Sequence, residues 1–188
     1  MPNLLELDLS WNHFLQFEHL EIWRQCHLKR LTASENPFDI AMTYSPKNIS
    51  ECSQYALEKL DLSGCLIGTI SEPTIPETLG TLVNLRSIDL SASGLTGPIP
   101  ESLGRLRFLE VLDLSRNRLT GPIPTFLGKL SKLDLSFNEL NGSIPESFGK
   151  LPALTDLYLE VNQLTGPIPA SIGSLVSLQA FSVYSNLS

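Results

Sequence analysis

The fold is decided by the stretch Leu85-Arg-Ser-Ile-Asp-Leu-Ser-Ala-Ser-Gly-Leu-Thr-Gly-Pro-Ile-Pro100. The same pattern begins again 24 residues later as Leu109-Glu-Val-Leu-Asp-Leu-Ser-Arg-Asn-Arg-Leu-Thr-Gly-Pro-Ile-Pro124. A self-similar period of this size is typical of solenoids, in which one structural unit is stacked on the next. Related copies extend in both directions, so we predict that the whole chain is one array of coils.

Eight copies begin near residues 4, 28, 57, 85, 109, 130, 154 and 178, and the last copy is incomplete. We interpret them as a single domain over residues 1–188. Insertions delay the third and fourth copies, whereas the sixth begins only 21 residues after the fifth. We predict that the convex arc loses the three missing residues, so that the strand register is unchanged.

Within each copy the pattern Leu-x-x-Leu-x-Leu has the period of two that a β-strand requires, with leucines on the buried face. The next segment, such as 101–109, places leucines three residues apart, which suits a short 3₁₀ helix. Between them, Gly97 and its neighbouring prolines indicate a constrained turn. We therefore predict an α/β solenoid: a curved right-handed coil with a parallel β-sheet on its concave face, short 3₁₀ or irregular segments on its convex face, and no evident caps.

An asparagine recurs at the ninth position of the copies, where the chain leaves the strand. Its side-chain amide can bond backbone groups that would otherwise be buried without partners. Cys65 and Ser93 replace it in two copies. The predicted structural ladder consists of Asn12, Asn36, Asn117, Asn138, Asn162 and Asn186.

The longer pattern Leu-x-x-Leu-x-Leu-Ser-x-Asn-x-Leu-Thr-Gly-x-Ile-Pro resembles the plant-type extracellular leucine-rich repeat. This repeat occurs in receptor-like kinases, receptor-like proteins and polygalacturonase-inhibiting proteins. The resemblance extends from Leu4 to Asn186 and is strongest from Leu85 onward. It implies a protein- or peptide-binding module of a plant cell-surface receptor ectodomain in defence or developmental signalling. The partners that it implies are a protein or peptide ligand and a co-receptor kinase.

Two other functions are compatible with the repeat. One is a secreted inhibitor of microbial cell-wall hydrolases, similar to the polygalacturonase inhibitors; the other is a truncated, non-functional repeat fragment. The insertions favour the receptor. Members of the family usually carry a signal peptide and caps, which this sequence lacks. We therefore expect an internal piece of a longer ectodomain, located outside the plasma membrane or in the apoplast with a membrane span downstream, or a truncated gene model.

Composition excludes several functions. The net charge of −7 offers no basic surface for nucleic acid or anionic lipid. No apolar run is long enough to span a membrane. His13, His19 and His27 are the only histidines and lie far in sequence from most of the aspartates, so no catalytic triad is indicated. No Cys/His spacing indicates a metal site. We expect neither an enzyme nor a cofactor.

The three cysteines cannot all pair with one another. Cys65 occupies a ladder position and is predicted to be a buried free thiol. Cys26 and Cys52 precede the leucines of adjacent coils, so they can form a disulfide in an oxidising compartment. Alternatively, each pairs with a cysteine outside this sequence.

Three segments match the N-glycosylation acceptor and begin at Asn48, Asn141 and Asn186. Asn48 lies in an insertion, which favours an accessible site. Asn186 belongs to the ladder and should be buried. We therefore predict glycosylation at Asn48 and Asn141.

The exposed face of the predicted sheet is the usual binding surface of a solenoid. Most copies show Asp-Leu-Ser there, a pattern that we interpret as a solvated strand. The residues that depart from this pattern are mainly aromatic or acidic, a composition that is typical of the anchor residues of an interface. Isolated exposed residues of this kind are also normal on any surface. The predicted partner-binding residues are Phe137, Asp156, Tyr158, Glu160, Val161 and Tyr184.

Overall fold

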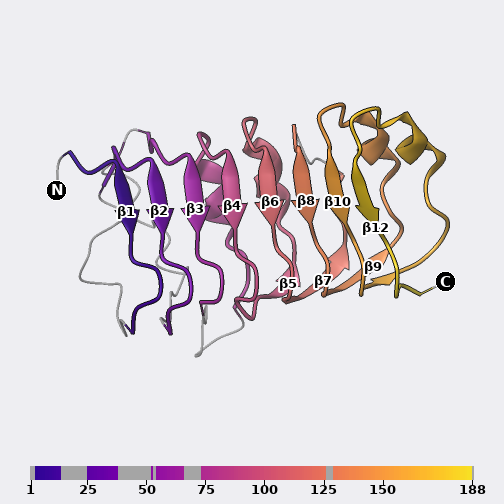
Figure 1. The fold of residues 1–188 in the computed structure, drawn as a ribbon, viewed down its shortest axis with the longest axis horizontal. Helices are drawn as coiled ribbons and strands as arrows, with labels where there is room; N and C mark the ends of the chain where they lie inside the picture. Colours follow the sequence, from indigo (N-terminus) through magenta and orange to yellow (C-terminus); the bar gives the residue numbers. More distant parts are fainter. Residues whose placement is uncertain are drawn as a thin grey trace.

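Eight short strands, one from each coil, form a parallel sheet in the computed structural model (Figure 1). The structure describes residues 3–13, 25–37, 52, 54–65, 73–125 and 129–187. We number the coils 1 to 8 along the chain. Their strands are β1 (Glu6–Asp8), β2 (Arg30–Thr32), β3 (Lys59–Asp61), β4 (Ser87–Asp89), β6 (Val111–Asp113), β8 (Lys132–Asp134), β10 (Asp156–Tyr158) and β12 (Ala180–Ser182).

The sheet stacks equivalent residues of successive coils. Neighbouring strands pair in chain order, and the fourth residue of each copy forms one continuous column. The column consists of Leu7, Leu31, Leu60, Ile88, Leu112, Leu133, Leu157 and Phe181. These side chains enter the core because alternate residues of a strand point to opposite faces. The predicted solenoid fold is confirmed.

The short spacing between coils 5 and 6 leaves the sheet undisturbed. Leu112 of β6 pairs with Leu133 of β8, so the two strands remain in the register that all other coils use. Leu130 and Leu133 are both buried. The coils can therefore lose residues outside the strand without shifting any side chain from one face of the sheet to the other.

A second sheet follows the asparagine ladder, which the sequence analysis did not predict. It contains β5 (Thr96–Pro98), β7 (Arg118–Pro122), β9 (Glu139–Gly142) and β11 (Gln163–Leu164), in the order β11-β9-β7-β5. The glycines and prolines of the Thr-Gly-Pro segments indicate turns, but these residues also pair with the next coil. Thr96–Pro98 lies beside Arg118–Thr120, while glycines at φ between 74° and 79° change the chain direction. These glycines are Gly97, Gly121, Gly142 and Gly166.

The opposite side of the solenoid carries short 3₁₀ helices, as predicted. They are η5 (Glu77–Thr81), η6 (Glu101–Arg105), η7 (Glu146–Lys150) and η8 (Ala170–Ser174). Each begins directly after a proline, which is in extended conformation before η5, η6 and η7, and a buried residue near the centre of each helix enters the core. Proline restricts its own φ and has no amide hydrogen, so it suits the position before a helical turn.

Asn117 shows how the ladder joins the coils. Its Oδ1 atom accepts hydrogen bonds from the amides of Ser93 and Leu95, at 3.1 and 2.9 Å. Its Nδ2 atom donates to the carbonyls of Leu90, Leu114 and Ser115 at 2.9 to 3.1 Å. One side chain therefore satisfies backbone groups in its own coil and in the preceding coil, all of them out of contact with water.

The cysteines divide into one disulfide and one free thiol. Cys26 and Cys52 are bonded, with 5.5 Å between their Cα atoms, so they link coil 1 to coil 2. Cys65 is free and buried, and its Sγ atom donates to the carbonyl of Ala33 at 3.1 Å. Burial raises the pKa of the Cys65 thiol above its ordinary value. This thiol therefore stays protonated and acts as a weak replacement for the ladder asparagine.

The hydrophobic core runs continuously through the stack. Its buried residues extend from Leu28 to Leu175, whereas Leu7 and Phe181, in the first and last coils, are only half-buried. An inner coil is covered on two sides by its neighbours, so burial depends on the stack rather than on the single coil. No helix in the described part of the chain is long and apolar enough to cross a membrane.

Candidate partner-binding face

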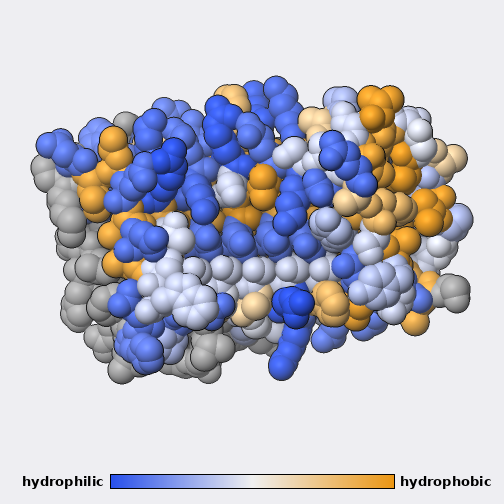
Figure 2. Space-filling view, viewed as in Figure 1, coloured by the Kyte–Doolittle hydropathy of each residue, from blue (hydrophilic) through white to orange (hydrophobic). Residues whose placement is uncertain are grey.

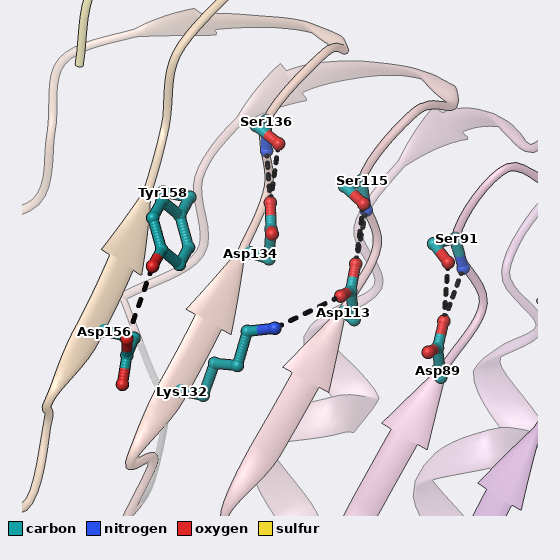
Figure 3. A network of polar contacts seen from close by, with 9 residues as sticks. All are labelled: Asp89, Ser91, Asp113, Ser115, Lys132, Asp134, Ser136, Asp156 and Tyr158. Carbon is teal, nitrogen blue, oxygen red and sulfur yellow. Dashed lines mark hydrogen bonds and ion pairs between the residues drawn. The ribbon is translucent and has the colours of Figure 1, made fainter. Parts of the chain in front are cut away.

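Most of the concave face is built from one repeated hydrogen-bonded unit. In five coils the aspartate of Asp-Leu-Ser accepts bonds from both the amide and the hydroxyl of the following serine (Figure 3 shows three). In addition to forming the open face of the strand, the unit therefore shapes the chain where it leaves the strand. The pairs are Asp8 and Ser10, Asp61 and Ser63, Asp89 and Ser91, Asp113 and Ser115, and Asp134 and Ser136.

The aspartates of the central coils are half-buried and lie beside one another. Burial raises the pKa of Asp89 and of Asp134 above the usual range, although the serine bonds oppose this effect. At the exposed end of the sheet, the bonds from Ser10 instead hold the pKa of Asp8 below its usual value. Asp89 and Asp134 are therefore harder to ionise than Asp8.

Ion pairs, four of them between coils and one within β3, balance much of the charge in coils 1 to 6. The closest approaches between charged atoms are 2.6 Å for Arg86 with Glu110, 3.0 Å for Lys29 with Glu58, and 3.6 Å for both Lys59 with Asp61 and Lys132 with Asp113; Arg30 also pairs with Glu6. The surface over β3 to β8 is accordingly hydrophilic, whereas hydrophobic residues gather towards the ends and most extensively around β10, β12 and η8 (Figure 2).

Coil 7 interrupts the repeated unit. Tyr158 stands where five other coils have aspartate, and Glu160 stands where they have serine. Tyr158 is half-buried between Asp134 and Ser182 of the neighbouring strands, and its hydroxyl donates to Asp156 Oδ1 at 3.3 Å (Figure 3). Burial, followed by the charge of Asp156, raises the pKa of Tyr158. The ring therefore presents a neutral, partly covered aromatic surface.

Glu160 lies between coils 6 and 8 and has an unsatisfied oxygen. Its backbone carbonyl accepts the Phe137 amide at 2.9 Å. Its side chain is half-buried, and the Oε2 atom is out of contact with solvent and has no hydrogen-bond partner in the described residues. A carboxylate oxygen without a donor is unfavourable in such a position. Glu160 thus differs from the serines at the same position of coils 5 and 6, whose hydroxyls are hydrogen-bonded to an aspartate.

The residue before each ladder position adopts a left-handed backbone conformation. In coil 6 this residue is Phe137, whose ring lies 5.0 Å from the Arg116 guanidinium carbon of the previous coil. In coil 7 it is Val161. The full set, with φ between 52° and 65°, is Trp11, Glu35, Gly64, Ala92, Arg116, Phe137, Val161 and Ser185. The stack therefore holds a row of side chains in a conformation that most residues avoid.

Replacement of Val161 by glycine should stabilise the protein. A β-branched residue at φ 55° is strained, and Gly64 occupies the equivalent position of coil 3 at φ 65°. We expect Val161→Gly to raise the free energy of unfolding by about 1 kcal/mol, measured by urea denaturation. Ala92→Gly is the control: its side chain is unbranched at φ 52°, so its gain should be smaller. A loss of stability in Val161→Gly would contradict the assignment of strain.

The predicted binding residues come from consecutive coils. The Phe137 amide bonds the Glu160 carbonyl, and the Val161 amide bonds the Tyr184 carbonyl at 3.0 Å. Phe137 and Tyr184 are 37% and 59% exposed. The structure adds Arg116 to this surface, which sequence reasoning missed. The sequence could have indicated Arg116, because this residue occupies the same repeat position as Phe137 in the preceding coil.

The other predicted sites have different surroundings. Asn141 is exposed on β9 at the second sheet, so its predicted glycosylation is sterically permitted. Asn48 lies outside the described residues. Asn186 uses its amide in the ladder, where Nδ2 donates to Leu159 and Val183, but the residue is half-buried rather than buried as predicted. No group of three or more potential metal ligands occurs in the part of the chain that the structure describes.

Comparisons with known proteins agree with this architecture. A model of the leucine-rich repeat region matches residues 40–184, and a leucine-rich repeat model matches residues 1–16. No curated protein matches significantly.

Among solved structures, the plant peptide hormone receptor RGFR1 in complex with RGF2 is 33% identical, with a TM-score of 0.84 over 98% of this chain. The ectodomain of the Arabidopsis receptor kinase HAESA, in complex with an extended IDA peptide hormone, is 34% identical, with a TM-score of 0.81 over 95%. HAESA in complex with IDA and the co-receptor SERK1 is 29% identical, with a TM-score of 0.68 over 98%.

The chain spans only 28%, 29% and 38% of these three solved chains. The similarity nevertheless covers nearly all of its own coils, and the family model alone accounts for most of the sequence. The chain therefore belongs to the leucine-rich repeat family, and its repeat is of the plant extracellular receptor type.

Proposed function

We propose that the concave face of coils 6 to 8 binds an extracellular peptide or protein. The observation that carries this proposal is the interruption of the repeated Asp-Leu-Ser unit by Tyr158 and Glu160. The fold does not require this change, because five other coils form the unit with good geometry. A local departure from a structurally sufficient pattern indicates a role in recognition.

The side chains of this surface suit an interface. Tyr158 is half-buried and held by Asp156, so its ring loses little conformational freedom when a partner covers it. Phe137 and Tyr184 lie on the coils to either side and are exposed. Large aromatic residues of this kind supply most of the binding energy in many interfaces.

The similar solved structures support a peptide as the partner. RGFR1 and HAESA are both solved with peptide hormones, and HAESA is also solved with a co-receptor. We extend these properties to this chain as part of a cell-surface receptor in defence or developmental signalling. Binding, rather than catalysis, is its role in this proposal. The co-receptor kinase is the second partner.

An extracellular location accompanies the proposal. The disulfide between Cys26 and Cys52 is suited to an oxidising compartment, because thiols are kept reduced in the cytosol. The exposed Asn141 acceptor is also compatible with the secretory pathway. We therefore place the chain in the apoplast or on the outer side of the plasma membrane.

Restoring the repeated unit in coil 7 tests the function. We expect the double variant Tyr158→Asp/Glu160→Ser to fold, because it recreates the pair seen at Asp134 and Ser136. Ten-residue peptides selected from a random display library on the full chain should bind this variant about 100-fold more weakly, since the central anchor is lost. The dissociation constants can be measured by isothermal titration calorimetry.

The matched control is Phe108→Ala. Phe108 is also an exposed aromatic residue, 49% accessible, and the centre of its ring lies 5.7 Å from the guanidinium carbon of Arg86. It lies before β6, outside the proposed surface, so its removal should leave peptide binding unchanged. If the double variant retains full affinity for every selected peptide, the proposed surface is wrong.

A further inference from the structure

We propose that Glu160, with Tyr158 and Tyr184, binds a basic side chain of the partner, preferably arginine. This inference rests on the proposed function and specifies the chemistry of the ligand. It follows from three features of coils 7 and 8: carboxylates without ion pairs, an oxygen without a donor, and aromatic rings on adjacent coils.

The first feature is charge. Asp156 and Glu160 have no lysine or arginine partner among the residues that the structure describes, unlike several carboxylates of the earlier coils. The nearest strand with a cation is β8, but its Lys132 is directed to Asp113, away from coil 7 (Figure 3). Coil 8 contributes no charged residue to this face. The charge of coil 7 is therefore left for a partner to neutralise.

The second feature is the Oε2 atom of Glu160. It is out of contact with water and receives no hydrogen bond within the described chain. A neutral ligand with only acceptor groups would leave this atom unsatisfied. Guanidinium and ammonium groups offer several hydrogen-bond donors. Their positive charge strengthens a hydrogen bond to a carboxylate. Glu160 is half-buried as a residue, so a change of its side-chain rotamer would bring the Oε2 atom within reach of a basic side chain on the concave face.

The third feature is the aromatic surface. Tyr158 precedes Glu160 by two residues on the same coil, and Tyr184 occupies the position equivalent to Glu160 on coil 8. The negative face of an aromatic ring attracts a cation, and arginine stacks on it through its planar group. The protein already uses this contact between coils at Arg116 with Phe137, 5.0 Å apart. Arginine therefore suits this site better than lysine.

The test compares two arrays of synthetic ten-residue peptides with random flanks. One array carries arginine at the central position, and the other carries citrulline, which has nearly the same shape without the charge. We expect the full chain to bind the best arginine peptides about tenfold more tightly than their citrulline versions. Glu160→Gln should reduce this difference to about twofold or less. Glu139→Gln, which removes the same charge from an exposed position on β9, should preserve it.

The outcomes separate this inference from the proposed function. If both arrays bind equally and Tyr158→Asp/Glu160→Ser abolishes this binding, the inference that the site recognises a basic side chain is wrong, whereas the proposed binding surface is correct. An arginine preference that persists in Glu160→Gln would overturn the assignment to Glu160. Absence of binding to either array would overturn both proposals. Denaturation midpoints of the variants, measured in parallel, show that each result comes from the site rather than from unfolding.

Discussion

Asn117→Ala should destabilise the protein by about 3 kcal/mol or more. The substitution leaves the amides of Ser93 and Leu95 without an acceptor and the carbonyl of Leu90 without a side-chain donor. Each buried polar group that loses its partner costs about 1 to 3 kcal/mol. The site lies in the middle of the stack, where water cannot easily replace the amide, so the losses should add. The midpoint of urea denaturation measures the change.

Asn12→Ala provides the matched control at the edge of the same ladder. Asn12 also donates to two carbonyls, those of Leu9 and Ser10, but these bonds are exposed. Water can replace them, so the loss should stay below about 1 kcal/mol. Equal losses in the two variants would show that intrinsic turn preference, rather than burial between coils, gives the ladder its stabilising effect.

Gly80→Ala should also destabilise the stack, by about 2 to 3 kcal/mol. A Cβ atom at Gly80 would lie 2.2 Å from the carbonyl oxygen of Ser102 and 2.6 Å from its carbonyl carbon. Both are backbone atoms of η6, so relief requires η5 and η6 to separate. Separation would open the core between coils 3 and 4. Thermal and urea denaturation report the loss.

Gly149→Ala and Gly173→Ala test the same explanation. A Cβ at Gly149 would lie 2.5 Å from the Ser171 carbonyl oxygen, so this variant should behave like Gly80→Ala. Gly173 occupies the corresponding place in η8 and would meet no described atom within 4 Å. Its replacement by alanine should be neutral. A comparable loss in Gly173→Ala would mean that these glycines are needed for backbone conformation rather than for close packing.

The leucine pattern alone was sufficient to predict the solenoid and the column position of each residue. Alternation placed Leu112 and Leu133 in the core, and the spacing after Pro100 indicated the 3₁₀ segment. The same pattern identified Phe137 and Tyr158 as departures on the exposed face. These properties depend on periodicity within one coil, so they can be read locally.

Contacts between coils could be identified only from the tertiary structure. The sequence left the partner of Cys26 open, and stacking brought Cys52 next to it. The Thr-Gly-Pro segments carry turn residues, yet Thr96–Pro98 pairs with Arg118–Thr120 of the next coil and so contributes to a second sheet. The role of Arg116 depends on Phe137 one coil away. Partners in adjacent coils are separated by about one repeat in sequence, so no local pattern identifies them.

The candidate site illustrates the same division. The sequence by itself determined that coil 7 carries Tyr158 and Glu160 in place of the usual aspartate and serine. Only the tertiary structure decided that the Glu160 oxygen lacks a donor and that Val161 is held at φ 55°. The physical reason is that column position follows from the backbone period, whereas hydrogen bonding, burial and strain depend on what the neighbouring coils place beside each side chain.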